Sequence, residues 1–209
     1  HSGGGIMSLE SAARFPVLIL FALLLLLAGG VYWQTGAVED VLIYRALQSI
    51  DPDDGEAARA DLMQRIAARS AQRPDNLQYH GLLGRLYMAE QNFAEAQASF
   101  ERLVALAPED PQALALAAQA RFLAQGRRLD DESQLFAERA LAVDPQQRTA
   151  LGMLGMASFE AGEYNAAVAY WERLQALEAP GSPAYQMLDD VLTLARQRSG
   201  AAPVVATAE

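Results

Sequence analysis

Hydrophobic residues recur at spacings of three and four along most of this chain. That spacing is the period of an amphipathic α-helix, which has one apolar and one polar face. Proline, glycine and acidic residues interrupt the pattern at short intervals, and such residues end one helix and begin the next. The chain is therefore predicted to be all-α and built from short consecutive helices.

One pair of helices occurs twice in nearly the same form. The first copy contains Leu83-Gly84-x-x-Tyr87, Phe93-x-x-Ala96-x-x-x-Phe100 and Pro108, and the second contains Leu154-Gly155, Tyr164-x-x-Ala167-x-x-x-Trp171 and Pro180. Gly155 lies 71 residues after Gly84, which is one period of 34 plus one of 37. Because 34 is the period of tetratricopeptide repeats, the pattern predicts a tetratricopeptide-repeat helical solenoid.

The repeat domain is predicted to cover residues 57–198. Its repeats are expected at about 77–110, 111–147 and 148–180, and a capping helix is expected at 182–198. The middle repeat departs from the pattern, because three additional residues precede its second helix in the loop that begins at Gly126. A longer loop costs little free energy, since loop-closure entropy grows only logarithmically.

Ten residues of the pattern are interpreted as structural. Small side chains let the two helices of a pair approach closely, aromatic rings fill the space beside them, and proline ends the second helix. Neighbouring pairs then complete the core. These residues are Gly84, Tyr87, Ala96, Phe100, Pro108, Pro145, Gly155, Tyr164, Ala167 and Trp171.

The first helix of each pair is expected to line a concave surface that binds a helix or an extended peptide. Methionine adapts to different partner side chains, and Arg85 can pair with a carboxylate, including a chain terminus. In the alternative interpretation, the methionine and phenylalanine residues pack on the next helix instead. The candidate peptide-binding residues are Gln78, Arg85, Met88, Gln112, Gln119, Phe122, Met156 and Phe159.

Residues 15–33 contain no charged residue and include five consecutive leucines. A helix of this length spans about 28 Å, close to the roughly 30 Å thickness of a bilayer core. Tyr32 and Trp33 lie at its far end, where aromatic rings favour the headgroup region. The segment is predicted to be one transmembrane helix; a cleaved signal peptide is the alternative, because Ala28 and Gly30 are small.

The charges beside this segment predict its orientation. Arg14 precedes it, and the first charge after it is Glu39, so the positive-inside rule places residues 7–14 in the cytoplasm. The repeat domain then lies in the periplasm, anchored to a bacterial inner membrane. Residues 1–6 are interpreted as a tag remnant and 199–209 as a disordered tail.

Residues 34–56 are interpreted as a juxtamembrane helix followed by a linker. Apolar residues form a broad stripe along residues 37–50, and Asp51-Pro52 ends it. The stripe is expected to pack on the chain's own solenoid or on lipid headgroups. A surface for a partner helix is the alternative.

Composition excludes several functions. The chain has 26 acidic and 16 basic residues, all of the latter arginine, and its net charge of −10 disfavours binding to nucleic acid. It has no cysteine, which excludes thiol-disulfide exchange and cysteine zinc sites, and only two histidines, His1 and His80. We therefore expect no catalytic, cofactor-binding or metal-binding residues, and no enzyme activity.

Three stretches carry a family resemblance. They are residues 82–88, the loop at 126–129 together with residues 138–145, and the block from Phe159 to Leu174. They resemble the periplasmic repeat domain of the cytochrome c maturation subunit CcmI, also called CycH, and of its relative NrfG. The resemblance covers roughly residues 57–197, and the off-period loop makes it more specific than the repeat consensus.

The resemblance implies a non-catalytic chaperone. Such a protein captures the C-terminal helix of an apocytochrome c and presents it to the haem lyase CcmF and the thiol reductant CcmH, or to their Nrf counterparts. CcmI usually has two membrane segments, whereas one is predicted here, which is closer to NrfG and cytochrome c nitrite reductase. Which cytochrome is the client stays open, and a generic scaffold for an envelope protein complex is the alternative function.

Overall fold

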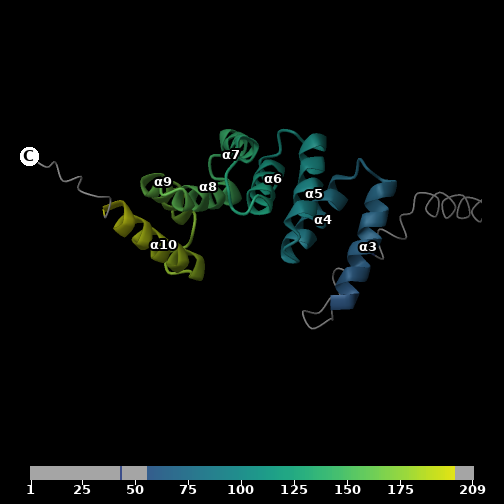
Figure 1. Cartoon of the computed structure of the whole chain (residues 1–209), viewed down its shortest axis with the longest axis horizontal. Coiled ribbons are helices and arrows are strands. Elements are labelled where there is room, and N and C mark those ends of the chain that lie inside the picture. The colour runs from purple at the N-terminus through teal and green to yellow at the C-terminus, as the bar shows by residue number, and fades with distance from the viewer. Residues whose placement is uncertain (1–42, 44–55, 201–209) are drawn as a thin grey trace, which may run out of the picture. The chain divides into compact units, whose positions relative to one another are not determined.

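The computed structural model of the chain describes residue 43 and residues 56–200 (Figure 1). The chain divides into two units, residues 1–65 and residues 66–209, and each is treated by itself. The predicted tag remnant, cytoplasmic N-terminus and transmembrane helix at 15–33 lie outside the described residues, as do nearly all of the juxtamembrane segment and the tail from residue 201. Within the described residues, no helix combines the length and the apolar character that crossing a bilayer requires.

All regular structure in the described residues is helical, which confirms the all-α prediction. The helices are α3 (Glu56–Gln72), α4 (Leu77–Ala89), α5 (Phe93–Leu106), α6 (Pro111–Ala124), α7 (Asp131–Val143), α8 (Arg148–Glu160), α9 (Tyr164–Gln175) and α10 (Pro183–Gly200). The first unit contains only the beginning of α3 among these elements.

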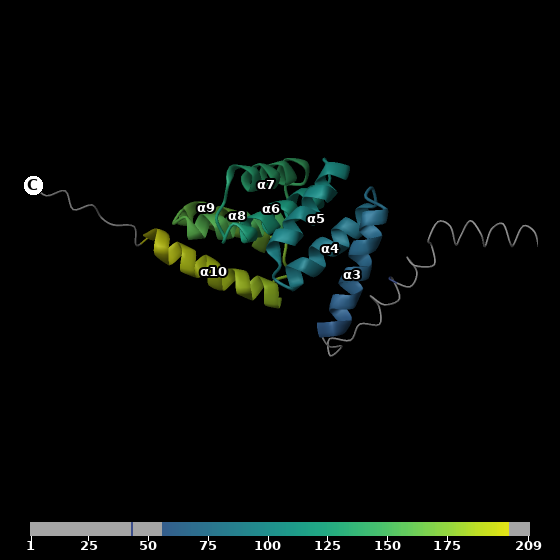
Figure 2. The same ribbon diagram turned by 45° about the vertical axis from the view of Figure 1, so that its right-hand side comes forward.

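The second unit is a stack of helix pairs. Helices α4 and α5, α6 and α7, and α8 and α9 pack as pairs, α5 contacts α6, α7 contacts α8, and α10 covers α9. The first helices of the second and third pairs, α6 and α8, also contact each other. In both views α7 and α9 lie on one side of the stack and α10 on the other (Figures 1 and 2).

A glycine opposite an aromatic ring sets the spacing of the first and third pairs. A Cβ atom at Gly84 would overlap the ring of Phe100, and one at Gly155 would overlap the ring of Trp171. In the middle pair, Ala118 and Ala137 occupy the corresponding positions, and both are fully buried. The interhelical volume is thus filled by a glycine and an aromatic ring in the first and third repeats, and by two alanines in the middle repeat.

The other structural residues predicted from the sequence lie as follows. Ala96 and Ala167 are fully buried, and Tyr87 and Tyr164 are half-buried. Pro108 and Pro145 are exposed in the turns after α5 and α7. The small residues therefore sit where helices approach, and the prolines sit where they end.

The first helix of each pair ends with the same backbone motif. The amides of Asn92, Arg127 and Glu163 each donate to the carbonyl five residues earlier, all at 2.8 Å. The residue before each of these amides has a positive φ, of 57° at Gln91, 68° at Gly126 and 79° at Gly162. This is the Schellman motif, whose left-handed position favours glycine.

Side chains in the turns between repeats cap the following helices, and arginines of the second helices bind carbonyls of these turns. Asn76, Asp110 and Gln147 each accept hydrogen bonds from amides in the first turn of the following helix. Arg139 donates to the carbonyl of Pro108 at 2.7 Å, and Arg173 donates to that of Pro145 at 2.9 Å. Each of these arginines therefore ties the second helix of its repeat to the end of the preceding repeat.

Candidate functional site

Two of the candidate peptide-binding residues on α4 are exposed. Gln78 and Arg85 both point away from the core, and no described hydrogen bond or ion pair uses the guanidinium of Arg85. A guanidinium with no carboxylate partner is free to bind one from another chain, in a two-bond geometry. The first helix of the first repeat therefore offers a cationic contact point.

Met156 is the exposed apolar side chain on the corresponding face of α8. It lies 71 residues after Arg85, so it occupies the same position in its repeat, and it is 36% exposed. Arg127, from the loop between α6 and α7, donates to the sulfur of Met156 at 3.0 Å and pairs with Glu160 at 2.5 Å. The inserted loop therefore reaches α8 and holds this methionine in place.

The two candidate glutamines of α6 are less available to a partner than Arg85. Gln112 is exposed, but its side-chain oxygen accepts a hydrogen bond from the amide of Gln147 at 2.8 Å, across the boundary between two repeats. Gln119 is half-buried. This part of the surface is polar and partly engaged within the chain.

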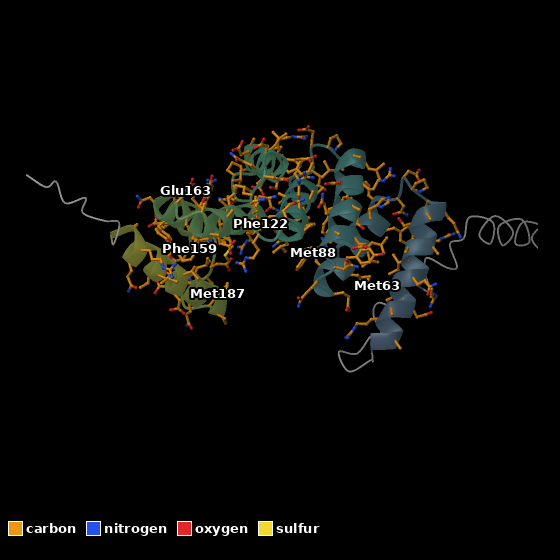
Figure 3. All side chains as sticks on the ribbon, viewed as in Figure 1. Met63, Met88, Phe122, Phe159, Glu163 and Met187 are labelled. Atoms are coloured by element: carbon orange, nitrogen blue, oxygen red, sulfur yellow. The ribbon has the colours of Figure 1, made fainter. Side chains whose placement is uncertain are left out.

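Three aromatic and methionine candidates pack against other residues. Phe122 is buried, which corrects the expectation that it faces a client, whereas Met88 and Phe159 are half-buried and their contact with a client stays a prediction. Phe122 is only 2% exposed and belongs to the main hydrophobic core. Met88 is half-buried against the same core. Figure 3 shows both on the side of the stack where the first helices lie, but their side chains are used inside the fold.

Phe159 is the third candidate residue that packs against other residues of the chain. Its ring lies 5.4 Å from that of Tyr164 and 5.6 Å from that of Trp171, and the guanidinium of Arg198 lies 5.2 Å above it. Offset and edge-on aromatic pairs with a cation above one ring are stabilising arrangements. These contacts occupy the surfaces of the ring, so Phe159 joins α8, α9 and the end of α10.

The capping helix supplies apolar surface that the sequence did not assign to the site. Met187 is 62% exposed and Leu194 is 41% exposed, while Leu188 and Leu192 on the neighbouring face are buried. Met187 and Leu194 are seven residues apart, so they share one face of α10.

The part of the chain that the structure describes contains no cluster of three or more potential metal-binding side chains. On the first helices, the groups that are available are the guanidinium of Arg85, amides and the exposed methionine of α8; the apolar face of α10 adds to them. Such a set offers one charge, hydrogen-bonding amides and apolar contact surface.

A family model described as the cytochrome c-type biogenesis protein H TPR domain matches residues 44–185. The chain is 32% identical, over 94% of its own length, to the cytochrome c-type biogenesis protein CycH of Pseudomonas aeruginosa, and the match spans 47% of that relative. The chain thus covers about half the length of this relative.

Two further proteins are similar at lower identity. The formate-dependent nitrite reductase complex subunit NrfG of Escherichia coli O157:H7 is 22% identical over 65% of this chain and 67% of its own length. The crystal structure of MamA protein superposes with a TM-score of 0.64 at 17% identity, covering 80% of this chain and 84% of that one. The first similarity agrees with the family resemblance, and the second shows the fold alone.

Proposed function

Because this chain belongs to the cytochrome c-type biogenesis protein H family, by the match of its TPR-domain model to residues 44–185, we propose that it is a non-catalytic chaperone of cytochrome c maturation. It binds the C-terminal helix of an apocytochrome c and delivers it to the haem lyase complex. The client lies along the exposed face formed by the first helices of the repeats.

The observation that carries this proposal is the unpaired guanidinium of Arg85 on the same repeat position as the exposed Met156. A helix that ends in a carboxylate can place that group on Arg85 and an apolar side chain on Met156. Each large apolar client side chain that is desolvated contributes about 1.5 to 3 kcal/mol before ordering costs.

The family and the N-terminal sequence support the proposed partners and location. The client passes to the haem lyase CcmF and the thiol reductant CcmH, or to their Nrf counterparts. Residues 15–33 hold the protein in the inner membrane, with the repeat domain in the periplasm. Similarity to both CycH and NrfG supports either a general c-type cytochrome or cytochrome c nitrite reductase as the client.

Binding of client peptides tests the proposal. The full chain in a nonionic detergent is titrated with fluorescent peptides that correspond to C-terminal helices of c-type cytochromes, and with scrambled peptides of the same composition. The native peptides should bind more tightly than the scrambled ones. Arg85→Ala should weaken binding at least about tenfold, because a hydrogen-bonded charge pair contributes about 1.5 to 3 kcal/mol.

Arg102→Ala is the matched control, because Arg102 is also an exposed arginine but lies on α5, the second helix of the same repeat. It should leave the affinity unchanged. Equal affinity for native and scrambled peptides would instead favour the generic scaffold, whose partners need have no connection with haem.

A further inference from the structure

In the second repeat, three carboxylates of the chain bind the side chain of one of its own arginines, Arg121. Arg121 on α6 lies 3.3 Å from Glu101 on α5, and 2.8 Å from both Asp130 and Glu132 at the start of α7. Burial lowers the pKa of Arg121, but the hydrogen bond and charge of Asp130, with the charges of Glu132 and Glu101, raise it above its ordinary value. Carboxylates from two second helices therefore hold one guanidinium between them.

The third repeat keeps one of these carboxylates at the equivalent position and has a second one residue before the equivalent of Asp130, but it lacks the arginine. Glu138 on α7 lies 37 residues after Glu101, and Glu163 is the N-cap residue of α9 as Asp130 is of α7. Ser158 lies 37 residues after Arg121, three residues after the glycine of its helix pair. A serine thus stands where the preceding repeat has the arginine that its carboxylates bind.

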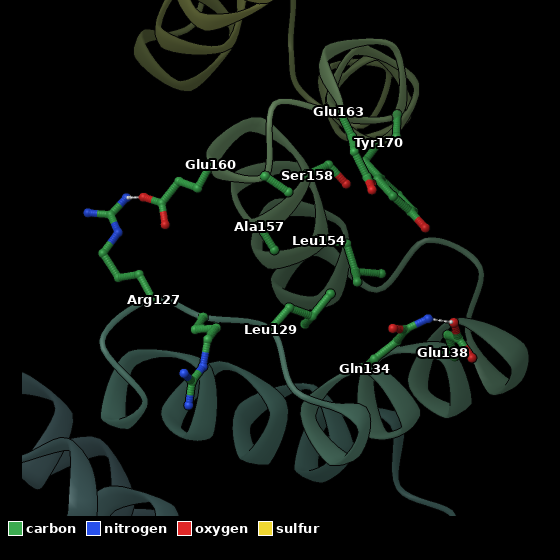
Figure 4. A pocket seen from close by; sticks show the side chains of 13 residues that line it. Arg127, Leu129, Gln134, Glu138, Leu154, Ala157, Ser158, Glu160, Glu163 and Tyr170 are labelled. Atoms are coloured by element: carbon green, nitrogen blue, oxygen red, sulfur yellow. Dashed lines mark hydrogen bonds and ion pairs between the residues drawn. The ribbon is translucent and has the colours of Figure 1, made fainter.

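A cavity of about 530 Å³ lies at this place, between α7, α8 and α9 (Figure 4). Its apolar wall includes Leu129, Leu154 and Ala157, and the inserted loop after α6 closes one end. Figure 4 shows the hydroxyl of Ser158 directed to the side where Glu163 and Tyr170 lie. The missing arginine has left space that no other side chain fills.

Three polar residues that line this cavity, Ser158, Glu163 and Tyr170, have no side-chain hydrogen bond or ion pair among the described residues. Ser158 is only 8% exposed, and no described residue hydrogen-bonds its hydroxyl. Neither Glu163 nor Tyr170 takes part in a described side-chain hydrogen bond or ion pair, and Glu138 accepts one bond from Gln134 at 2.7 Å. The Ser158 hydroxyl opens into the cavity, where it is available to a ligand or to water.

The charges around the cavity select the ligand. Glu160 is already neutralised by Arg127, at 2.5 Å. Glu138 and Glu163 remain without an ion pair among the described residues, against one unpaired arginine, Arg128. The cavity is therefore negative overall and disfavours an anion.

We propose that this cavity is a second binding site and that it takes the side chain of an arginine from another protein. The aliphatic stem packs on Leu129 and Leu154, and the guanidinium donates to Glu163 and Glu138. Ser158 and Tyr170 offer further oxygen acceptors to its five N–H donors. The ligand repeats, between proteins, the contacts that Arg121 makes within the chain.

A pair of isosteric peptides tests the site directly. Acetyl-Gly-Leu-Arg-Leu-Gly-amide and the same peptide with citrulline in place of arginine are titrated into the isotopically labelled full chain in nonionic detergent. Amide shifts at residues 129, 154, 158 and 163 report binding. The arginine peptide should bind at least about tenfold more tightly, because citrulline has the same shape without the charge. Equal affinity of the two peptides overturns the proposal.

Variants of the cavity provide the second test. Ser158→Arg restores the internal arginine of the preceding repeat, so it should abolish peptide binding and raise the unfolding midpoint. Glu163→Gln should weaken binding about tenfold, while Glu95→Gln, which removes an exposed carboxylate from α5, should leave it unchanged. Should Ser158→Arg fail to fold, Glu163→Gln decides: an unchanged affinity in that variant contradicts the site.

This site can fail separately from the proposed client surface. Arg85→Ala, which tests the face formed by the first helices, should leave binding of the arginine peptide unaltered. A parallel loss of both activities in that variant contradicts the assignment of a separate site.

Discussion

Single small residues determine how closely the helices of a pair approach. Gly84 and Gly155 each lie under an aromatic ring, and there is no room for a Cβ atom at either position. The middle repeat reaches similar packing with Ala118 and Ala137, which are both fully buried. The residue type that fits at the glycine position of a helix pair therefore depends on the residue type at the aromatic position opposite it.

Gly155→Ala tests this dependence. Alanine favours a helix by about 1 kcal/mol, but the new Cβ displaces Trp171, so we expect a net loss of about 1 to 2 kcal/mol. Trp171→Ala alone should cost about 3 to 5 kcal/mol. The double variant, which reproduces the alanine pair of the middle repeat, should lose less than the sum of the two in chemical denaturation. Strict additivity would contradict the dependence.

Gln91 has a strained backbone conformation. It has a φ of 57° at the position where the other two repeats have Gly126 and Gly162. A side chain in this left-handed region costs about 1 kcal/mol, so Gln91→Gly should stabilise the protein by roughly that amount. The midpoint of urea unfolding measures the gain, and Gly162→Gln should give a loss of similar size. A destabilised Gln91→Gly variant would show that the glutamine side chain makes an unrecognised contribution.

Residue positions could be predicted from the sequence only where the repeat period fixes them. The glycine and aromatic positions recur at fixed offsets, and their environments follow from helix geometry. Phe122 and Phe159 were placed by the same period, but each lies in the last turn of its helix, where the Schellman turn and the next helix cover it. How far each of these rings is buried depends on tertiary contacts, which cannot be derived from a single sequence.

The start of α7 shows how a helix end can also join repeats. Asp130 and Ser133 form a reciprocal capping box, in which the Ser133 amide donates to Asp130 at 2.9 Å. Burial raises the pKa of Asp130, but hydrogen bonds from Ser133 and Arg121 outweigh it and hold the pKa below its usual range. Ionised Asp130 therefore stabilises the folded state.

The pH dependence of Asp130→Asn measures this contribution. Asparagine still caps the helix but carries no charge. Because the folded-state pKa is lowered, the stabilisation is fully present above the unfolded-state value of about 3.9 and is lost as pH falls through the folded-state pKa. The wild-type protein should exceed the variant in stability at pH 7, and the difference should shrink below about pH 4. A difference that is constant with pH would exclude the charge as its cause.

At the level of elements, the sequence predicted the helix pairs because glycine, aromatic and proline positions mark their contacts and ends. It also located the three added residues before α7, since they break the period. It did not predict the cavity beside Ser158. The arginine-binding role of the cavity is inferred from the three carboxylates around Arg121. These residues of α5, α6 and α7 come together only in the folded chain.

At the scale of the whole molecule, the repeat domain offers two separate surfaces. One face of the first helices exposes Arg85 and Met156, whereas the cavity beside Ser158 lies where α8 meets the second helices α7 and α9. A solenoid of this kind can hold two partners at once, because each repeat contributes a helix to either side. We expect the two test peptides, the cytochrome helix and the arginine peptide, to bind together without competition, and mutual displacement in a two-colour titration would contradict two sites.

The family relation confirms the resemblance found in the sequence and supplies the biological context. The match spans 47% of the CycH relative, and the remaining half of that protein has no counterpart in the aligned region. The net charge of −10 favours encounter with cationic segments, which agrees with a site for arginine.

Site-specific photo-crosslinking tests the central claim most directly. A benzophenone amino acid is placed at position 85 or 156 on the first helices, and at position 102 or 173 on the second helices as matched controls. Irradiation of the full chain with the C-terminal helix of an apocytochrome c should give adducts from positions 85 and 156 only. Adducts from positions 102 and 173 in equal yield, or no adducts from any position, would contradict a client surface on the first helices.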